Sequence, residues 1–184
     1  MSEQRIYQIK ITLDDIRPPI WRRVQVPGAI TLADLHDVIQ VVMGWENCHL
    51  HEFRIGSGRY APSVNEEFDM EMTAGDTEVR LCDVVTRPKA KLRYIYDFGD
   101  DWRHTLTVEK ILEPEAGGKY PICLAGERAC PPEDCGGPWG YSDILEARKH
   151  PDDPQLAELL EWAGRYDPEA FDLKAVNARL RRLH

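Results

Sequence analysis

Apolar and polar side chains alternate twice near the start of the chain, over residues 6–13 and again over residues 20–26. A period of two is typical of a strand with one buried face, because successive side chains point to opposite sides of a sheet. The Pro18-Pro19 pair between the two segments predicts a loop. We therefore expect two antiparallel strands joined by this loop.

The period changes to that of a helix after residue 30. Thr31 suits the N-cap position, with Asp34 three residues later, and Gly44 suits the C-terminal end. The apolar side chains between them fall on one helical stripe, made of Leu32, Leu35, Val38, Ile39 and Val42. The pattern predicts one amphipathic helix.

Three later segments, residues 49–55, 91–97 and 102–112, return to a period of two. We expect three strands, the last two forming a hairpin. Residues 56–76 are polar and irregular, which predicts a long surface loop, and residues 81–85 fit either a helical turn or a strand. The side chains that the first of these strands would place on one face are His49, His51, Phe53 and Ile55.

This order of elements favours an α+β fold. We expect a β-grasp-like mixed sheet with one helix across it, plus a C-terminal helical segment with helix starts near Ser142, Pro154 and Pro168. Residues 1–122 would form the β-grasp-like core. Residues 123–184 would form a Pro/Gly/Cys-rich loop and helices packed on that core, giving a single domain overall.

The segment richest in candidate chemistry is residues 120–141, which holds three of the five cysteines, four prolines and the Gly136-Gly137 pair. Such a composition disfavours a regular helix or a central strand. The segment DFGDDWRH, residues 97–104, lies just upstream. We expect the CPPEDC loop of residues 130–135 and this turn to meet in space as the functional surface.

The net charge of −9 disfavours broad binding to nucleic-acid backbones. Arg17, Arg22 and Arg23 are the best candidate for a local DNA contact, and a solvated strand edge is the alternative. The N-terminus lacks the apolar segment of a secretory signal, and no run of about 18 apolar residues occurs. We expect a cytoplasmic protein with no membrane partner.

Four segments together resemble the plasmid pRiA4b ORF-3-like family: HLHEF, YDFGDDWRH, GERACPPEDCGG and FDLKAVNARL. The resemblance runs from about Tyr7 to Leu180. It implies a bacterial or archaeal protein of a family without an established activity, some members of which are labelled as passengers of mobile elements or as resolvases. The chain shows no positioned serine nucleophile with an arginine cluster, so its residues give the resolvase label no support.

Cys123, Cys130 and Cys135 form a first candidate site, with zinc as the ion. Thiolates bind zinc well, but the spacings C-x6-C and C-x4-C differ from the C-x2-C knuckle, and a fourth ligand would have to come from elsewhere. Two alternatives are that the three cysteines are small buried hydrophobic residues or that they include a redox pair.

A second candidate site is catalytic and combines imidazoles with carboxylates. Such a set would suit a metal-dependent hydrolase if the side chains converged around an open position for water. In the alternative, the histidines are hydrogen-bonded at the edge of the core and the aspartates bind backbone amides of the FGDD turn. The candidate residues are His49, His51, Asp97, Asp100 and His104.

A third candidate is a binding surface made of Trp139, Tyr141, Asp101 and Trp102, although strand aromatics usually pack inward. The acidic run Pro132-Glu133-Asp134 fits backbone capping, or a carboxylate pair for acid–base chemistry. We expect a non-enzymatic binding or adaptor module with a protein or small-molecule partner. The alternatives are a zinc-dependent hydrolase and a mobile-element accessory protein that contacts DNA.

Overall fold

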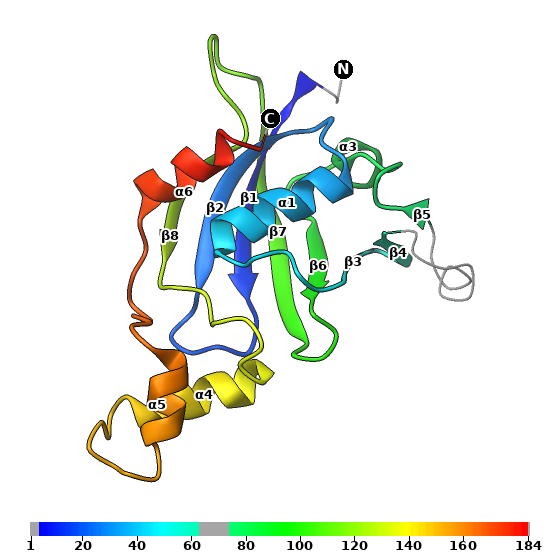
Figure 1. Ribbon diagram of the computed structural model, residues 1–184. Helices are drawn as coiled ribbons and strands as arrows, with labels where there is room; N and C mark the ends of the chain where they lie inside the picture. The colour runs from blue at the N-terminus through cyan, green and yellow to red at the C-terminus, as the bar shows by residue number, and fades with distance from the viewer. Residues whose placement is uncertain (1–3, 63–73, 184) are drawn as a thin grey trace.

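The computed structural model describes residues 4–62 and 74–183 (Figure 1). Part of the loop predicted over residues 56–76 therefore lies outside the described residues. The described strands form one sheet in the order β5-β4-β3-β6-β7-β1-β2-β8. Their bounds are β1 Ile6–Leu13, β2 Trp21–Pro27, β3 His51–Ile55, β4 Gly58–Ala61, β5 Ala74–Gly75, β6 Lys91–Tyr96, β7 Trp102–Leu112 and β8 Ile122–Glu127.

Strand β1 lies inside the sheet and pairs antiparallel with both β2 and β7. The pairing of β1 with β2 and the β6–β7 hairpin were both predicted from the alternation, and both are confirmed. The short β4–β5 pair is parallel, so the sheet is mixed. The α+β class and the mixed sheet are therefore confirmed.

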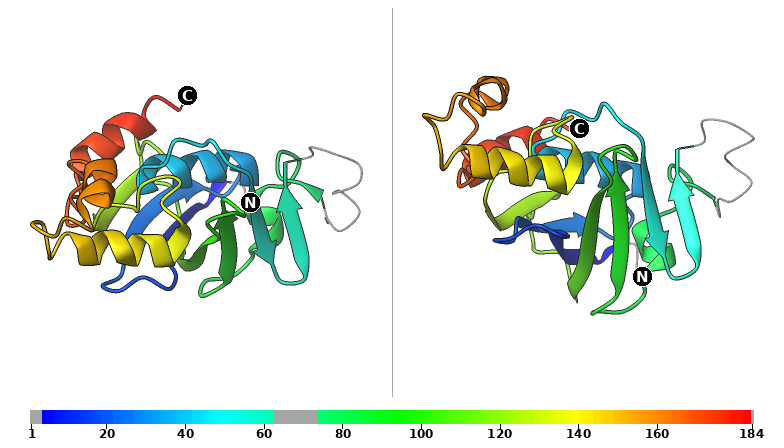
Figure 2. Two further views of the ribbon diagram at one scale, coloured as in Figure 1. Left: turned by 60° about the horizontal axis from the view of Figure 1, so that its bottom comes forward. Right: turned by 90° about the horizontal axis from the view of Figure 1, so that it is seen from below.

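Helix α1 (Leu32–Met43) lies across one face of the sheet (Figure 2). The Thr31 hydroxyl accepts a hydrogen bond from the Asp34 amide at 3.0 Å, and Gly44 ends the helix with φ 109°, as the sequence predicted. The predicted apolar stripe is buried against the inward face of the strands. Each such side chain contributes roughly 1.5–3 kcal/mol when fully buried.

Strand β8 lies where the sequence indicated an irregular loop. It is an edge strand that pairs only with β2 among the described strands, with a register shift between Arg23 and Val24. An edge position tolerates the neighbouring Pro121 and the internal Gly126, because one side of the strand needs no partner. Strand β8 also spans the boundary expected between residues 122 and 123, so the sheet continues into the C-terminal part.

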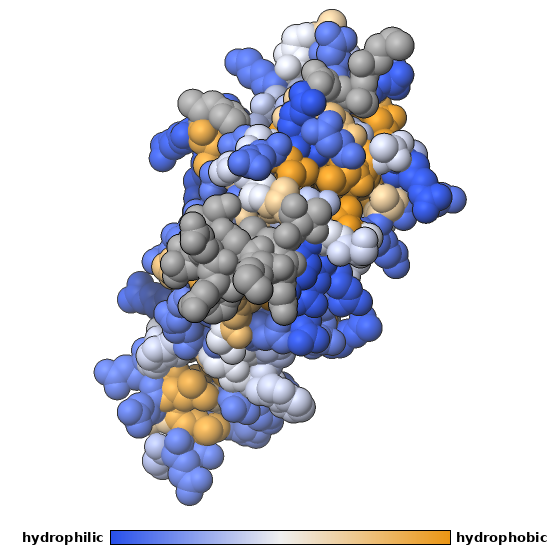
Figure 3. Space-filling model, turned by 90° about the vertical axis from the view of Figure 1, so that its right-hand side faces the viewer, coloured by the Kyte–Doolittle hydropathy of each residue, from blue (hydrophilic) through white to orange (hydrophobic). Residues whose placement is uncertain are grey.

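The remaining described helices are α3 (Leu81–Val84), α4 (Gly137–Ala147), α5 (Ala157–Ala163) and α6 (Leu173–Leu180). Helix α6 packs on β8 and α1, whereas α4 and α5 pack on each other at the lower end of Figure 1. Helix α5 has no buried residue, and Figure 3 shows apolar surface at the end of the molecule that α4 and α5 form. Helix α4 starts at Gly137, earlier than the predicted Ser142, and no described helix is long and apolar enough to cross a membrane.

Candidate metal centre

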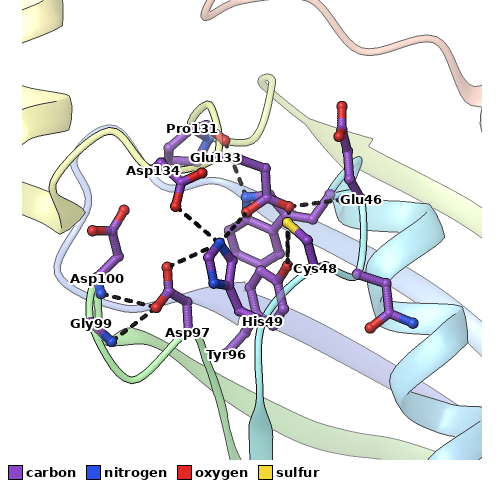
Figure 4. A network of polar contacts seen from close by, with 12 residues as sticks. Glu46, Cys48, His49, Tyr96, Asp97, Gly99, Asp100, Pro131, Glu133 and Asp134 are labelled. Atoms are coloured by element: carbon purple, nitrogen blue, oxygen red, sulfur yellow. Dashed lines mark hydrogen bonds and ion pairs between the residues drawn. The ribbon is translucent and has the colours of Figure 1, made fainter.

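Three connections that are distant in sequence meet at one end of the sheet (Figure 4). They are residues 44–50 between α1 and β3, residues 97–101 between β6 and β7, and residues 128–136 between β8 and α4. The CPPEDC loop and the DFGDDWRH turn therefore contact each other, as the sequence predicted, and the α1–β3 connection joins them.

The His49 ring is at the centre of this junction, and three carboxylates surround its Nε2 atom (Figure 4). Nε2 lies 3.0 Å from Asp134 Oδ1, 3.6 Å from Asp97 Oδ2 and 3.9 Å from Glu133 Oε2. Two zinc-bound nitrogen or oxygen donors in a tetrahedron lie about 3.3 Å apart, given zinc–ligand bonds of about 2.0–2.1 Å. The observed distances bracket that value, so each carboxylate is spaced from the His49 imidazole as a second ligand of the same ion would be.

Asp97 is held in place by the turn that follows β6. Its backbone has φ 56°, and its amide donates to Leu50 O at 2.9 Å, which fixes the turn to the start of β3. Its Oδ1 atom accepts hydrogen bonds from the amides of Gly99 at 2.9 Å and Asp100 at 3.3 Å. The other oxygen, Oδ2, is left to face His49.

The CPPEDC loop is anchored by groups from the α1–β3 connection and from β6. The indole of Trp45 donates to Pro131 O at 3.1 Å. Glu133 Oε1 accepts two hydrogen bonds, from the Glu46 amide at 2.8 Å and from the Tyr96 hydroxyl at 3.1 Å. These two bonds orient the Glu133 carboxylate so that its second oxygen, Oε2, points toward His49.

The loop also approaches the turn through backbone groups. The Gly136 amide donates to Asp100 Oδ2 at 3.2 Å. Gly137 has φ 68°, and a Cβ added there would lie 2.5 Å from Asp100 O. Only glycine allows this close contact without a shift of the backbone. The Gly136-Gly137 pair therefore brings the acidic residues of the loop next to the turn.

Two polar atoms inside this junction form no hydrogen bond with any residue that the structure describes, namely His49 Nε2 and Glu133 Oε2. Both atoms are buried, and a buried polar atom without a partner costs roughly 1–3 kcal/mol. Three carboxylates around one imidazole also repel each other. A divalent cation would supply the missing partner for both atoms and offset the negative charge.

Among the described residues, two overlapping groups of His, Cys, Asp or Glu have ligand atoms that all lie within 4.8 Å of one another. One group is His49, Asp97 and Asp134, and the other is Cys48, His49 and Glu133. His49 belongs to both. The oxygen and nitrogen donors of the first group suit Zn²⁺ or Mn²⁺, and the Cys48 sulfur of the second group suits Zn²⁺.

His51 and His104 do not reach this junction. Strand β3 begins at His51, so His49 precedes it, and the predicted shared face does not form. The Nε2 atom of His51 lies 2.8 Å from Asp76 Oδ2, and its ring stacks on His36. His104 is fully buried among aromatic rings, and burial lowers its pKa to about 3. Of the five predicted residues, the structure brings His49 and Asp97 together.

The three predicted thiol ligands belong to neither metal-ligating group. Cys123 is buried in β8, with its Sγ atom 3.5 Å from Ala125 O. Burial raises the pKa of Cys123 and Cys130, and raises that of Cys135 to about 12. The surroundings of Cys123 and Cys130 match the alternative interpretation, that of buried hydrophobic residues, whereas Cys135 is half-buried.

Of the three aromatic side chains in the predicted binding surface, only Trp139 is exposed. Trp102 is fully buried and Tyr141 is 1% exposed, with its hydroxyl accepting a hydrogen bond from Tyr166. Asp101 forms an ion pair with Arg103. Trp139 is 86% exposed and lines an open groove of about 620 Å³ that also includes Gly99, Asp100 and Gly136. The groove therefore adjoins the carboxylate junction.

The predicted arginine patch does not form either. The Arg22 side chain is buried and donates to four backbone carbonyls, those of Val42, Trp21, Glu127 and Arg128. Arg23 makes a two-point contact with Glu109. Arg17 alone of the three is exposed and without a hydrogen bond or ion pair to a described residue. The three arginine side chains therefore do not form one exposed surface that could contact DNA.

Glu133, Asp134 and Cys48 were not predicted from the sequence as candidate metal ligands. The acidic pair was noted, but capping and acid–base chemistry were the only roles considered. One signal was available, because the adjacent residues Cys48-His49 and Glu133-Asp134 each offer two side chains that can bind a metal in an irregular segment. Nothing in the sequence indicates that these two segments meet.

Comparisons with known proteins agree with the resemblance. A family model described as plasmid pRiA4b ORF-3-like protein matches residues 5–175. The uncharacterized protein y4hQ of Sinorhizobium fredii is 40% identical over 175 residues, covering 94% of this chain and 89% of the relative. The crystal structure of a protein of unknown function, MM3350 from Methanosarcina mazei Go1, matches with a TM-score of 0.83 and 38% identity. That match covers 92% of this chain and 96% of the other.

Proposed function

The chain belongs to the plasmid pRiA4b ORF-3-like family, and from the geometry of the junction we propose that it is a non-enzymatic binding module that holds a divalent metal ion. The ion would bind at His49 Nε2, between the carboxylates of Asp97, Glu133 and Asp134. One observation supports this most directly: the buried Nε2 of His49 has no hydrogen-bond partner yet faces three carboxylates. A metal ion is the ligand that accepts both donor types at these spacings.

In this proposal the ion has a structural task. It would fix the CPPEDC loop and the FGDD turn to the α1–β3 connection, and so hold the shape of the adjacent groove. The exposed Trp139 on that groove is suited to anchor a protein or small-molecule partner. The likeness of the sheet to β-grasp recognition platforms is an analogy at the level of fold. A cytoplasmic location fits the proposal, because Cys48 would stay reduced there.

Metal analysis of untagged protein tests this proposal. We expect about one zinc ion per chain after equilibration with zinc and removal of the excess, and a loss of at least tenfold in affinity for Glu133→Gln and for Asp134→Asn. The matched control is Asp152→Asn, which removes an exposed carboxylate in the connection between α4 and α5 and should leave zinc affinity unchanged. Zinc binding that is absent from the native chain, or equal in all variants, overturns the proposal.

A metal-dependent hydrolase is the second candidate, on the evidence of one feature. The Asp134 side chain is 69% exposed, so the junction is open on that side and an ion there would have room for a water molecule. The ligands would then be His49, Asp97 and Asp134 instead of the wider predicted set. Zinc-loaded protein that hydrolyses ester or phosphoester substrates, with activity lost in Asp134→Asn, would favour this candidate over the binding module.

A further inference from the structure

We propose that Cys48 binds the same ion through its thiolate, which makes the site selective for thiophilic ions of the zinc class over Mg²⁺, Ca²⁺ and Mn²⁺. This inference rests on the proposed function, because it concerns the identity of the metal at that site. Cys48 precedes His49 in the α1–β3 connection, and the zinc site expected from the sequence was built on three other cysteines.

The position of Cys48 supports the inference. Its sulfur belongs to a group with His49 and Glu133 in which the ligand atoms all lie within 4.8 Å of one another. The Cys48 amide donates to the Tyr96 hydroxyl at 3.1 Å, and the same hydroxyl donates to Glu133 Oε1 at 3.1 Å. Tyr96 therefore fixes the backbone of one ligand and the carboxylate of the other relative to each other.

The two other ligands of this group carry the unpartnered buried atoms. His49 Nε2 and Glu133 Oε2 have no hydrogen-bond partner, whereas Asp97 already accepts two backbone hydrogen bonds and Asp134 is largely exposed. Placing the ion among Cys48, His49 and Glu133 therefore satisfies the atoms that most need a partner. Asp97 and Asp134 would remain beside the ion and contribute negative charge.

The chemistry of this group decides which ion it takes. A thiolate, an imidazole and a carboxylate provide one soft, one borderline and one hard ligand, a set that suits tetrahedral Zn²⁺ or Co²⁺ with a water at the fourth position. Mg²⁺ requires six oxygen ligands in near-octahedral geometry, and Ca²⁺ requires six to eight. Neither ion gains from a thiolate, so the sulfur discriminates against both.

Cobalt substitution tests the inference, because Co²⁺ reports its ligands by absorption. We expect the metal-free protein titrated with Co²⁺ to develop visible d–d bands and a near-ultraviolet thiolate-to-cobalt charge-transfer band. Cys48→Ser should abolish the charge-transfer band and weaken Zn²⁺ affinity about tenfold or more, with little change in Mn²⁺ affinity. The matched control, Cys135→Ser, changes a half-buried thiol of the facing loop and should retain the band.

The outcomes separate the two proposals. Visible bands without a charge-transfer band, unchanged in Cys48→Ser, would overturn Cys48 as a ligand and leave the metal site in place. An absence of cobalt and zinc binding altogether would overturn both. As a second measurement, bound Zn²⁺ should slow alkylation of Cys48 by iodoacetamide at least tenfold, as read by mass spectrometry of the modified peptide. Equal alkylation rates with and without bound Zn²⁺ would contradict the inference.

Discussion

His49 and His51 are two positions apart in the chain, but their surroundings differ in kind. His51 contacts the Asp76 carboxylate at 2.8 Å, and its ring stacks on His36 at a centroid distance of 3.5 Å. Both ring nitrogens of His36 also have hydrogen-bond partners, namely the Tyr94 hydroxyl and the Asn47 side chain. His49 faces three carboxylates, and its Nε2 forms no hydrogen bond within the described part of the chain.

The difference distinguishes polar groups that stabilise the fold from polar groups that are available to bind a ligand. In the His36–His51–Asp76 cluster, donors and acceptors are matched, so burial is tolerated and the network gains rigidity. In the His49 junction, hydrogen-bond acceptors exceed donors and negative charge is in excess. A bound cation would offset that charge. Four measurements can break or sharpen this contrast.

The largest effect is expected from Asp76→Ala. The side chain of Asp76 is 2% exposed and that of His51 is 6% exposed, so the change leaves a buried imidazole without its partner. We expect a loss of about 3 kcal/mol in the free energy of unfolding, measured by urea denaturation. Zinc affinity should be unchanged in the folded fraction. A loss below about 0.5 kcal/mol would mean that the matched cluster does not stabilise the fold.

Acidification should produce the next largest effect. Burial lowers the pKa of His36 to about 4, below its ordinary value of 6.5. Between these two values the unfolded chain binds more protons than the folded chain, so stability is present above pH 6.5 and is lost as the pH falls toward 4. The slope for one histidine approaches 1.4 kcal/mol per pH unit, or about 2 kcal/mol between pH 6.5 and pH 5.

Urea midpoints measured from pH 7 to pH 5 in chelator check this expectation. The variant His36→Gln should show a shallower slope by that amount. A residual slope should remain, because burial also lowers the pKa of His104 to about 3. Identical slopes for the native chain and the variant would show that protonation of His36 does not change the free energy of unfolding.

Asp100→Ala should have a smaller effect on stability. Its Oδ2 accepts one hydrogen bond from the Gly136 amide at a partly exposed position, so we expect a loss of about 0.5–1 kcal/mol. Zinc affinity should fall about tenfold in isothermal titration, because the loop that carries Glu133 and Asp134 loses a contact with the turn. The control Asp143→Ala removes an exposed carboxylate of α4 and should affect neither quantity. Unchanged zinc affinity in Asp100→Ala would mean that the loop is positioned without this bond.

The smallest effect on stability is expected from Asp134→Asn in chelator, within about 0.5 kcal/mol. Asn tolerates the left-handed backbone of this position, φ 53°, and the change lowers the repulsion among the three carboxylates. Zinc at 100 times its dissociation constant should stabilise the native chain by about 2.7 kcal/mol. Thermal melts at the same zinc concentration should show most of that gain lost in the variant. A clear loss of stability in chelator would instead show that Asp134 stabilises the fold without a metal, as Asp76 does.

Much of the fold could be predicted because its signals are local. The alternation of β1 and β2 and the stripe of α1 each depend on side chains within one element, and the caps Thr31 and Gly44 act over three or four residues. Strand β8 was missed because Pro and Gly argue against a strand in general but not against an edge strand. The start of α4 was missed because Gly136 caps it through a left-handed backbone instead of a side chain.

The site could be predicted only in part, because its geometry depends on contacts between distant segments. The meeting of the CPPEDC loop with the FGDD turn was expected, and His49 and Asp97 were among the candidates. The period of two placed His49 on the same face as His51, but the strand begins one position after Leu50, and this difference separates the two rings. The excess of acceptors around His49 appears only when Glu133 and Asp134 are brought beside it.

The sequence separation of the ligands has a kinetic consequence. Glu133 contacts the α1–β3 connection 87 positions after Glu46, and Tyr96 contacts Glu133 across 37 positions. Closing loops of this length before the sheet has formed is entropically unfavourable, so the ligands should assemble late in folding. A bound ion would then leave the folding rate nearly unchanged and slow unfolding, which is the behaviour of a contact absent from the transition state. In this respect the junction would differ from a zinc knuckle, whose neighbouring ligands let the metal direct folding from the start.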